Sequence, residues 1–178
     1  MSTPTILPFK GVWPTIAADA FIAPNATVIG DVVIGARSSI WFNCVLRGDV
    51  NYIRVGARTN IQDGTIVHVA TSDGPTIIGN DVLIGHAAII HGCTLEDGCF
   101  VGMAATVMDD AVVESGAMVA AGALVGPNKR VPHGQLWAGK PAKFLRELKA
   151  KEIADMKVQT ARYADLAATY KAMPELKG

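Results

Sequence analysis

Aliphatic residues recur every six positions along most of this chain. The series begins at Ile22 and ends at Val131, and small residues cluster beside it, as in Ile34-Gly35-Ala36. An α-helix turns about 100° per residue, so aliphatic residues six apart would be scattered around its surface. A chain that turns a corner every six residues, with one aliphatic side chain pointing inward on each side, accounts for the pattern.

Three hexads close one triangular coil, and successive coils stack like strands of a parallel sheet, ~4.8 Å apart. The sequence therefore predicts an all-β fold with an appended helix, namely a left-handed parallel β-helix of hexapeptide repeats and a C-terminal α-helix. We expect the β-helix domain over residues 1–140, with 1–19 capping the first coil and 132–140 as a connector. The alternative, a β-sandwich, would not keep a six-residue phase for so long.

The phase of the repeat breaks at three places. Three extra residues lie around Asp49-Val50-Asn51, and five extra residues lie in Thr71–Pro75, whose composition predicts a protruding loop. Between Ile90 and Val101 two hexads are one residue short, because Leu95 already keeps phase with Val101.

The period changes to three and four residues from about Ala142, which predicts an amphipathic helix over 141–178, packed along one flank of the β-helix. Its apolar positions are Leu145, Leu148, Ile153, Met156, Tyr163, Leu166 and Tyr170.

Composition narrows the functional classes. The 178 residues suit one domain with a small appendage, and 16 basic residues balance 16 acidic ones. A nucleic-acid or membrane-surface protein would show a basic excess, so neither partner is expected. The chain shows no signal-peptide pattern and no long apolar run, so we expect a cytoplasmic protein. Cys44, Cys93 and Cys99 are expected to be reduced and buried.

Three of the four histidines fall close together in the sequence. His68 and His91 each follow an inward aliphatic residue, and they are separated by one 18-residue coil plus the five-residue loop. If the loop bulges out, the two imidazoles lie one above the other and can share a tetrahedral metal ion. His86 belongs to a different face, so it cannot easily join them within one chain but could do so across an interface, which predicts a trimer about a three-fold axis. His133 lies in the connector.

The same counting places Arg47 one coil below His68. A metal held by three histidines lowers the pKa of bound water toward ~7 and gives hydroxide at neutral pH. Gln62 could orient that hydroxide, and Arg47 could pair with carboxylates or steer an anion. An intersubunit salt bridge between Arg47 and Asp49 is the alternative, and it is compatible with a site role.

This ordered set of polar residues resembles the gamma-class carbonic anhydrase family over nearly the whole chain. The segments that carry the resemblance are Arg47-Gly48-Asp49, Asn60-Ile61-Gln62-Asp63, His68, His86, His91, Ser39-Ile40-Trp41 and Gly139-Lys140-Pro141-Ala142-Lys143.

The resemblance implies a homotrimer in which His68 and His91 of one subunit and His86 of the next hold a metal. It also implies catalytic roles around the metal-bound water for Arg47, Asp49, Asn60, Gln62 and Asp63. Tyr163 resembles the helix tyrosine that family members bring near the site. Zinc suits three imidazoles, with iron(II) or cobalt as alternatives. The implied reaction is attack of metal-bound hydroxide on CO2 to give bicarbonate.

One departure concerns proton export. The family's best-studied branch has a long acidic loop with a proton-shuttling glutamate, whereas residues 69–85 hold Asp73 and Asp81 as their only acids. The chain therefore resembles the short-loop branch, and CO2 hydration could be slow. The alternatives are an acyl-CoA thioesterase or other metal hydrolase on the same site, an acyltransferase, which the cluster of three histidines disfavours, and a weakly catalytic, metal-stabilised trimeric scaffold.

Overall fold

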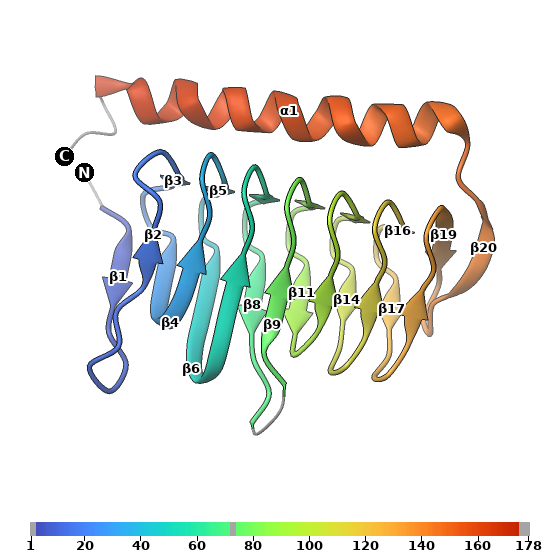
Figure 1. Ribbon diagram of the computed structural model, residues 1–178, viewed down its shortest axis with the longest axis horizontal. Helices are drawn as coiled ribbons and strands as arrows, with labels where there is room; N and C mark the ends of the chain where they lie inside the picture. Colours follow the sequence, from blue (N-terminus) through green and yellow to red (C-terminus); the bar gives the residue numbers. More distant parts are fainter. Residues whose placement is uncertain (1–2, 72–73, 175–178) are drawn as a thin grey trace.

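The structure is a parallel β-helix with one long helix lying along it (Figure 1). It is a computed structural model that describes residues 3–71 and 74–174. Short parallel strands repeat at each coil, and their inward aliphatic side chains form a single core. The predicted β-helix with a C-terminal helix is confirmed.

The strands form two sheets. The eight-stranded sheet consists of β3 (Phe21–Ile22), β5 (Ser39–Ile40), β7 (Asn60–Ile61), β10 (Leu83–Ile84), β13 (Phe100–Val101), β16 (Met118–Val119), β19 (Gln135–Ala138) and β20 (Lys143–Glu147). The twelve-stranded sheet consists of β1 (Thr5–Leu7), β2 (Thr15–Ile16), β4 (Thr27–Ile34), β6 (Val45–Val55), β8 (Ile66–His68), β9 (Thr76–Ile78), β11 (Ile89–His91), β12 (Thr94–Leu95), β14 (Thr106–Val107), β15 (Val112–Val113), β17 (Leu124–Val125) and β18 (Arg130–Val131). Among the strands of the described residues, β20 alone runs antiparallel to its neighbour, β19.

The larger sheet covers two faces because β6 runs from one to the other. Its first residues pair with β8, and its last residues pair with β9. The three extra residues around Asp49 are thus absorbed into one continuous strand, which pairs along β4 with a shift in register between Gly30 and Val32. At the next break, Thr71 and the residues from Gly74 onward are described, whereas Ser72 and Asp73 of the expected loop lie outside the described residues. Leu95 pairs with Ile78, in agreement with the expected one-residue contraction.

The inward positions predicted by the repeat are buried. Ile40, Leu46, Ile61, Ile84 and Ile90 have no exposed surface. Burying an aliphatic side chain of this size contributes about 1.5–3 kcal/mol. The stack of inward side chains is therefore the main favourable term that holds the coils in register.

The C-terminal helix, α1 (Ala150–Ala172), begins later than the helical period of the sequence predicts. The expected start at Ala142 is wrong, because Lys143–Glu147 forms β20 against the last coil. The carboxylate of Glu152 accepts hydrogen bonds from the Lys149 backbone N–H and the Arg146 guanidinium, all at 2.8 Å, and so fixes the first turn.

The buried face of α1 also differs from the expected stripe. Met156, Thr160, Ala164 and Ala167 are buried, whereas Leu166 is exposed. Leu145 is exposed as well, on β20. Small side chains allow the helix to approach the flat side of the coils closely, which a row of leucines would prevent.

A column of glycines marks one corner of successive coils. A Cβ atom placed on Gly56 would lie 2.5 Å from the backbone carbonyl of Gly79, and one on Gly35 would lie 2.6 Å from that of Gly56. No side chain fits between coils at this corner.

We predict that Gly56→Ala lowers the free energy of unfolding by about 1–3 kcal/mol or more, because the backbone must shift to admit the methyl group. Gly126→Ala is the matched control, since a Cβ there meets no atom within 4 Å. Urea denaturation at one fixed protein concentration measures both. Equal midpoints for the two variants would contradict the packing argument.

Candidate metal centre and its surroundings

His68 and His91 face each other on adjacent strands of the larger sheet. They are register partners in β8 and β11, and Arg47 of β6 is the register partner of His68 on the other side. The Nδ1 atom of His68 lies 3.1 Å from Nε2 of His91. The stacking of these three residues, which the sequence predicted by counting, is confirmed.

Asp49 links Arg47 to His68. Its carboxylate forms an ion pair with the Arg47 guanidinium and lies 3.1 Å from Nε2 of His68. Burial alone would raise the pKa of Asp49, but hydrogen bonds from Arg47, the Val50 backbone N–H and His68 outweigh it and lower the pKa to about 2. Asp49 is therefore ionised at neutral pH, and its salt bridge with Arg47 forms within one chain.

The imidazole of His68 is affected mainly by its partial burial. Burial lowers its pKa, and the hydrogen bond to Asp49 opposes this shift only in part. A neutral imidazole retains a lone pair on one ring nitrogen, which is the form that binds metals.

His86 lies apart from this pair, at a corner between β10 and β11. Its Nδ1 atom is 2.9 Å from the carboxylate of Asp63, which comes from the coil below. Within the described residues of one chain, no three His, Cys, Asp or Glu side chains converge as a metal site. The sequence-based expectation that His86 occupies a different face agrees with this arrangement.

Asn60 and Gln62, two further candidate residues, are buried between coils. The side-chain amide of Asn60 donates to Ser39 Oγ at 3.4 Å, and its Oδ1 atom has no hydrogen-bond partner in the described part of the chain. A buried acceptor without a partner costs free energy, about 1–3 kcal/mol.

Comparison with known proteins places this geometry in a family. Residues 14–48 match the family model described as bacterial transferase hexapeptide (six repeats). Gamma carbonic anhydrase 1, mitochondrial, of Arabidopsis thaliana is 54% identical over 164 residues, which are 89% of this chain and 60% of that protein. A carbonic anhydrase of Geobacillus kaustophilus is 42% identical over 170 residues, which are 96% of this chain and 93% of that protein.

The chain belongs to the gamma-class carbonic anhydrase family. It spans about 57–62% of the length of three plant relatives of this class. A solved structure from Bacillus cereus, which carries the name acetyltransferase, superimposes with a TM-score of 0.94 at 40% identity and covers 96% of this chain and 99% of that one. The gamma-class fold thus has relatives under both names.

Tyr163, which the family resemblance places near the site, lies on α1 within an aromatic cluster. Its ring packs edge-on against Trp41, with ring centroids 5.9 Å apart, and Phe21, Phe42 and Tyr170 complete the cluster. These contacts anchor the helix to the coils. A role of Tyr163 in a gamma-class site stays a prediction.

Asp109 is a further neighbour of the histidine pair, and it is not among the site residues predicted from the sequence. Its carboxylate pairs with Nδ1 of His91. The signal was present in the sequence, because Asp109 follows His91 by 18 residues and so lies one coil above it.

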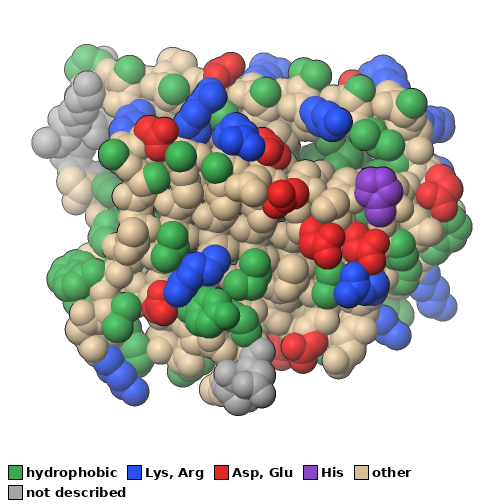
Figure 2. Space-filling model, viewed as in Figure 1, with side chains coloured by type: hydrophobic (Ala, Val, Ile, Leu, Met, Phe, Trp, Pro, Cys, Tyr) green, Lys and Arg blue, Asp and Glu red, His purple; other side chains and the backbone are tan. Residues whose placement is uncertain are grey.

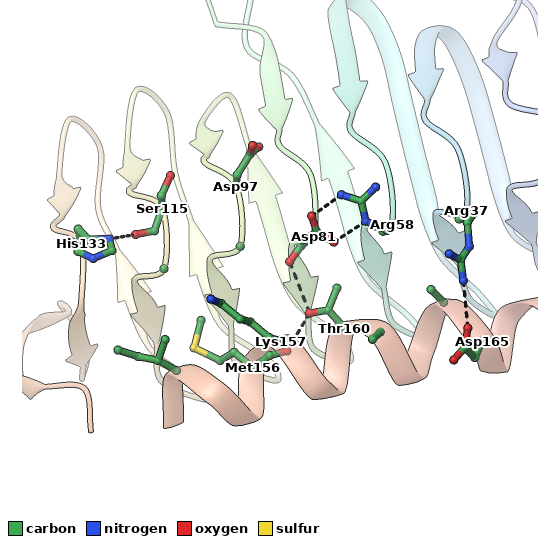
Figure 3. A pocket seen from close by; sticks show the side chains of 15 residues that line it. Arg37, Arg58, Asp81, Asp97, Ser115, His133, Met156, Lys157, Thr160 and Asp165 are labelled. Carbon is green, nitrogen blue, oxygen red and sulfur yellow. Dashed lines mark hydrogen bonds and ion pairs between the residues drawn. The ribbon is translucent and has the colours of Figure 1, made fainter. Parts of the chain in front are cut away.

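A groove of about 770 Å³ lies between α1 and the corners of several coils (Figure 3). Its lining includes Met156, Lys157 and His133, but none of the three candidate metal ligands. Two ion pairs form among its lining residues, Arg58 with Asp81 and Arg37 with Asp165. The groove is therefore separate from the histidine pair.

The distribution of surface charge and the character of the helix relate to two partners that the sequence does not predict, nucleic acid and membranes. Figure 2 shows basic and acidic side chains interspersed over one face, in keeping with the equal numbers of the two in the sequence. Across residues 3–71 and 74–174, the structure contains no helix whose length and apolar character would let it span a membrane. A cytoplasmic location stays a prediction.

The three cysteines are free and buried, as expected. Burial raises the pKa of the Cys44 and Cys93 thiols to about 12, and it raises that of Cys99 as well. Because the thiolate is the reactive form, none of them is a nucleophile at neutral pH.

We predict that the native protein at pH 8 does not react with Ellman's reagent within minutes. In guanidinium chloride all three thiols should react. A rapid phase in the native protein would contradict the burial of the thiols.

Proposed function

We propose that this protein is a metal-dependent carbonic anhydrase that converts CO2 and water to bicarbonate and a proton. The observation that carries the proposal is the pair of imidazole nitrogens of His68 and His91, 3.1 Å apart. Tetrahedral coordination at ~2.0–2.1 Å needs ligand nitrogens roughly 3.3 Å apart, so the pair fits a zinc ion closely. Iron(II) and cobalt accept the same ligands.

His68 and His91 would hold the ion together with His86 of a neighbouring copy. The chemistry that a divalent ion supplies there is activation of water, since it lowers the pKa of water toward ~7 and provides a nucleophile at neutral pH. Carboxylates on the outer nitrogens of metal-binding histidines fix ring orientation. Asp49 is placed to do this for His68, and Asp63 for His86.

The other residues act on substrate and water. The guanidinium of Arg47 is partly exposed beside Asp49, so it can attract bicarbonate while it keeps the carboxylate ionised. Gln62 is buried one position before Asp63, where its amide could orient water.

Each turnover also releases a proton. The described residues between His68 and His86 include no glutamate to carry it, so we expect slow turnover in weak buffer and faster turnover in concentrated buffer.

Stopped-flow CO2 hydration on protein of measured metal content tests the proposal. Wild type loaded with zinc, or anaerobically with iron(II), should turn over in proportion to its metal content. His91→Ala should lose at least 100-fold in kcat/KM, because one ligand is removed.

The matched control is His133→Ala, which removes a histidine whose contacts are with Ser115 and Glu114 rather than the histidine pair. It should retain wild-type turnover. Absence of turnover in the wild type at about one metal per chain would refute the proposal and leave the thioesterase and scaffold alternatives.

The separation of His86 from the histidine pair supports a three-fold assembly. On the face that presents His68 and His91, the apolar side chains of Ile66 and Ile89 are 39% and 45% exposed. Met103 is 57% exposed at the next corner position above His86. Contact between this corner and the isoleucine face of a second copy would cover these groups and complete the three ligands.

We therefore predict a mass in solution three times the 18.7 kDa of one chain. Ile89→Asp should weaken the assembly and reduce metal affinity, whereas Leu166→Asp, on the exposed side of α1, should change neither. Light scattering coupled to gel filtration measures the mass. A metal-loaded monomer at micromolar concentration would be incompatible with the shared site.

A further inference from the structure

Each of the three candidate metal ligands has one ring nitrogen paired with a carboxylate. Asp49 pairs with Nε2 of His68, Asp63 with Nδ1 of His86, and Asp109 with Nδ1 of His91. Of these three carboxylates, the family resemblance assigns roles to Asp49 and Asp63 but not to Asp109. Asp109 completes the same arrangement for the third histidine.

We infer that Asp109 is a positioning residue for His91, an inference that rests on the proposed function. Its carboxylate accepts the Nδ1–H of the His91 imidazole, and this contact leaves Nε2 as the nitrogen with the lone pair. That same Nε2 atom faces Nδ1 of His68 at 3.1 Å. The hydrogen bond thus selects the tautomer in which the lone pair points to the place where the two rings meet.

The backbone around Asp109 is held by the coils on both sides. The carbonyl of Asp109 accepts the Asn128 N–H at 2.9 Å, and the next residue, Asp110, donates its N–H to the Gly92 carbonyl at 2.8 Å. Gly92 directly follows His91, so one hydrogen bond ties the corner of Asp109 to the residue next to its partner.

Gly92 also leaves room for the carboxylate. A Cβ atom on Gly92 would lie 2.8 Å from Oδ1 of Asp109, and the backbone there has a φ of +53°. The absence of a side chain allows the Asp109 carboxylate to reach the His91 ring. A surface ion pair formed by chance would need neither this space nor the fixed corner.

Asp110 provides a matched control one residue away. It is exposed, and its φ of +58° is a conformation that Asn adopts readily. Asp110→Asn therefore removes the same charge at nearly the same place without touching His91. Asp109→Asn removes the carboxylate that pairs with the imidazole.

Competition for zinc against a chromophoric chelator, starting from metal-free protein, tests the inference. We expect Asp109→Asn to bind zinc 10–100-fold more weakly than wild type, as for other carboxylates that orient a metal-binding histidine. Asp110→Asn should bind like wild type, and all three metal-free proteins should melt at similar temperatures. Equal zinc affinity for the Asp109 and Asp110 variants would overturn the inference.

The tautomer of His91 gives a second readout that needs no metal. In ¹⁵N NMR spectra of the metal-free wild type, His91 should appear as the Nδ1–H form, and Asp109→Ala should shift it toward a mixture. A wild-type Nε2–H form would also overturn the inference. If the wild type binds zinc but hydrates no CO2, the proposed reaction fails, while the affinity comparison still decides the role of Asp109.

Discussion

The backbone ladder between successive coils is the constraint on which the rest of the molecule depends. Inside the stack, each short strand hydrogen-bonds to the coil below and the coil above, and the inward aliphatic side chains hold these ladders in a single register. A slip by one residue would turn every inward side chain outward. The side chains that follow an inward position therefore have nearly fixed places on the surface. Val67 and Ile90 are register partners in the core, so the residues that follow them, His68 and His91, are also brought side by side.

This constraint explains why so much of the arrangement could be predicted from the sequence. Once the phase breaks are located, counting from one inward residue to the next places Arg47, His68 and His91 in one column, and it puts His86 on a different side. The three extra residues around Asp49 do not disturb the count, because β6 takes them up within one continuous strand. Similar aliphatic residues recur at the inward position of every coil, so many separate positions along the chain support the same repeat.

Contacts that do not follow the repeat were harder to predict. The antiparallel pairing of β20 with β19 comes from a segment without hexad phase, whose apolar residues also fit a helical period. The helix lies close to the coils, so its buried face favours small side chains such as alanine over leucine. A prediction based on large apolar residues at helical spacing does not detect such a face. Asp109 is not the register position above His91, because this coil is one residue short and pairs Ile90 with Val107. Continuing that register from His91 gives Met108, and Asp109 is the residue after it.

The antiparallel strand β20 has a consequence for the solubility of a stack of this kind. A parallel coil ends in a row of free N–H and C=O groups, and such an edge can accept the first coil of another molecule and so grow into a fibre. Here the chain reverses and covers the end of one face with a strand that contains Lys143, Arg146 and Glu147, after which the helix leads away. A strand of opposite direction and mixed charge is a poor template for a further parallel coil. This end of the eight-stranded sheet is thereby closed to the addition of a further parallel coil.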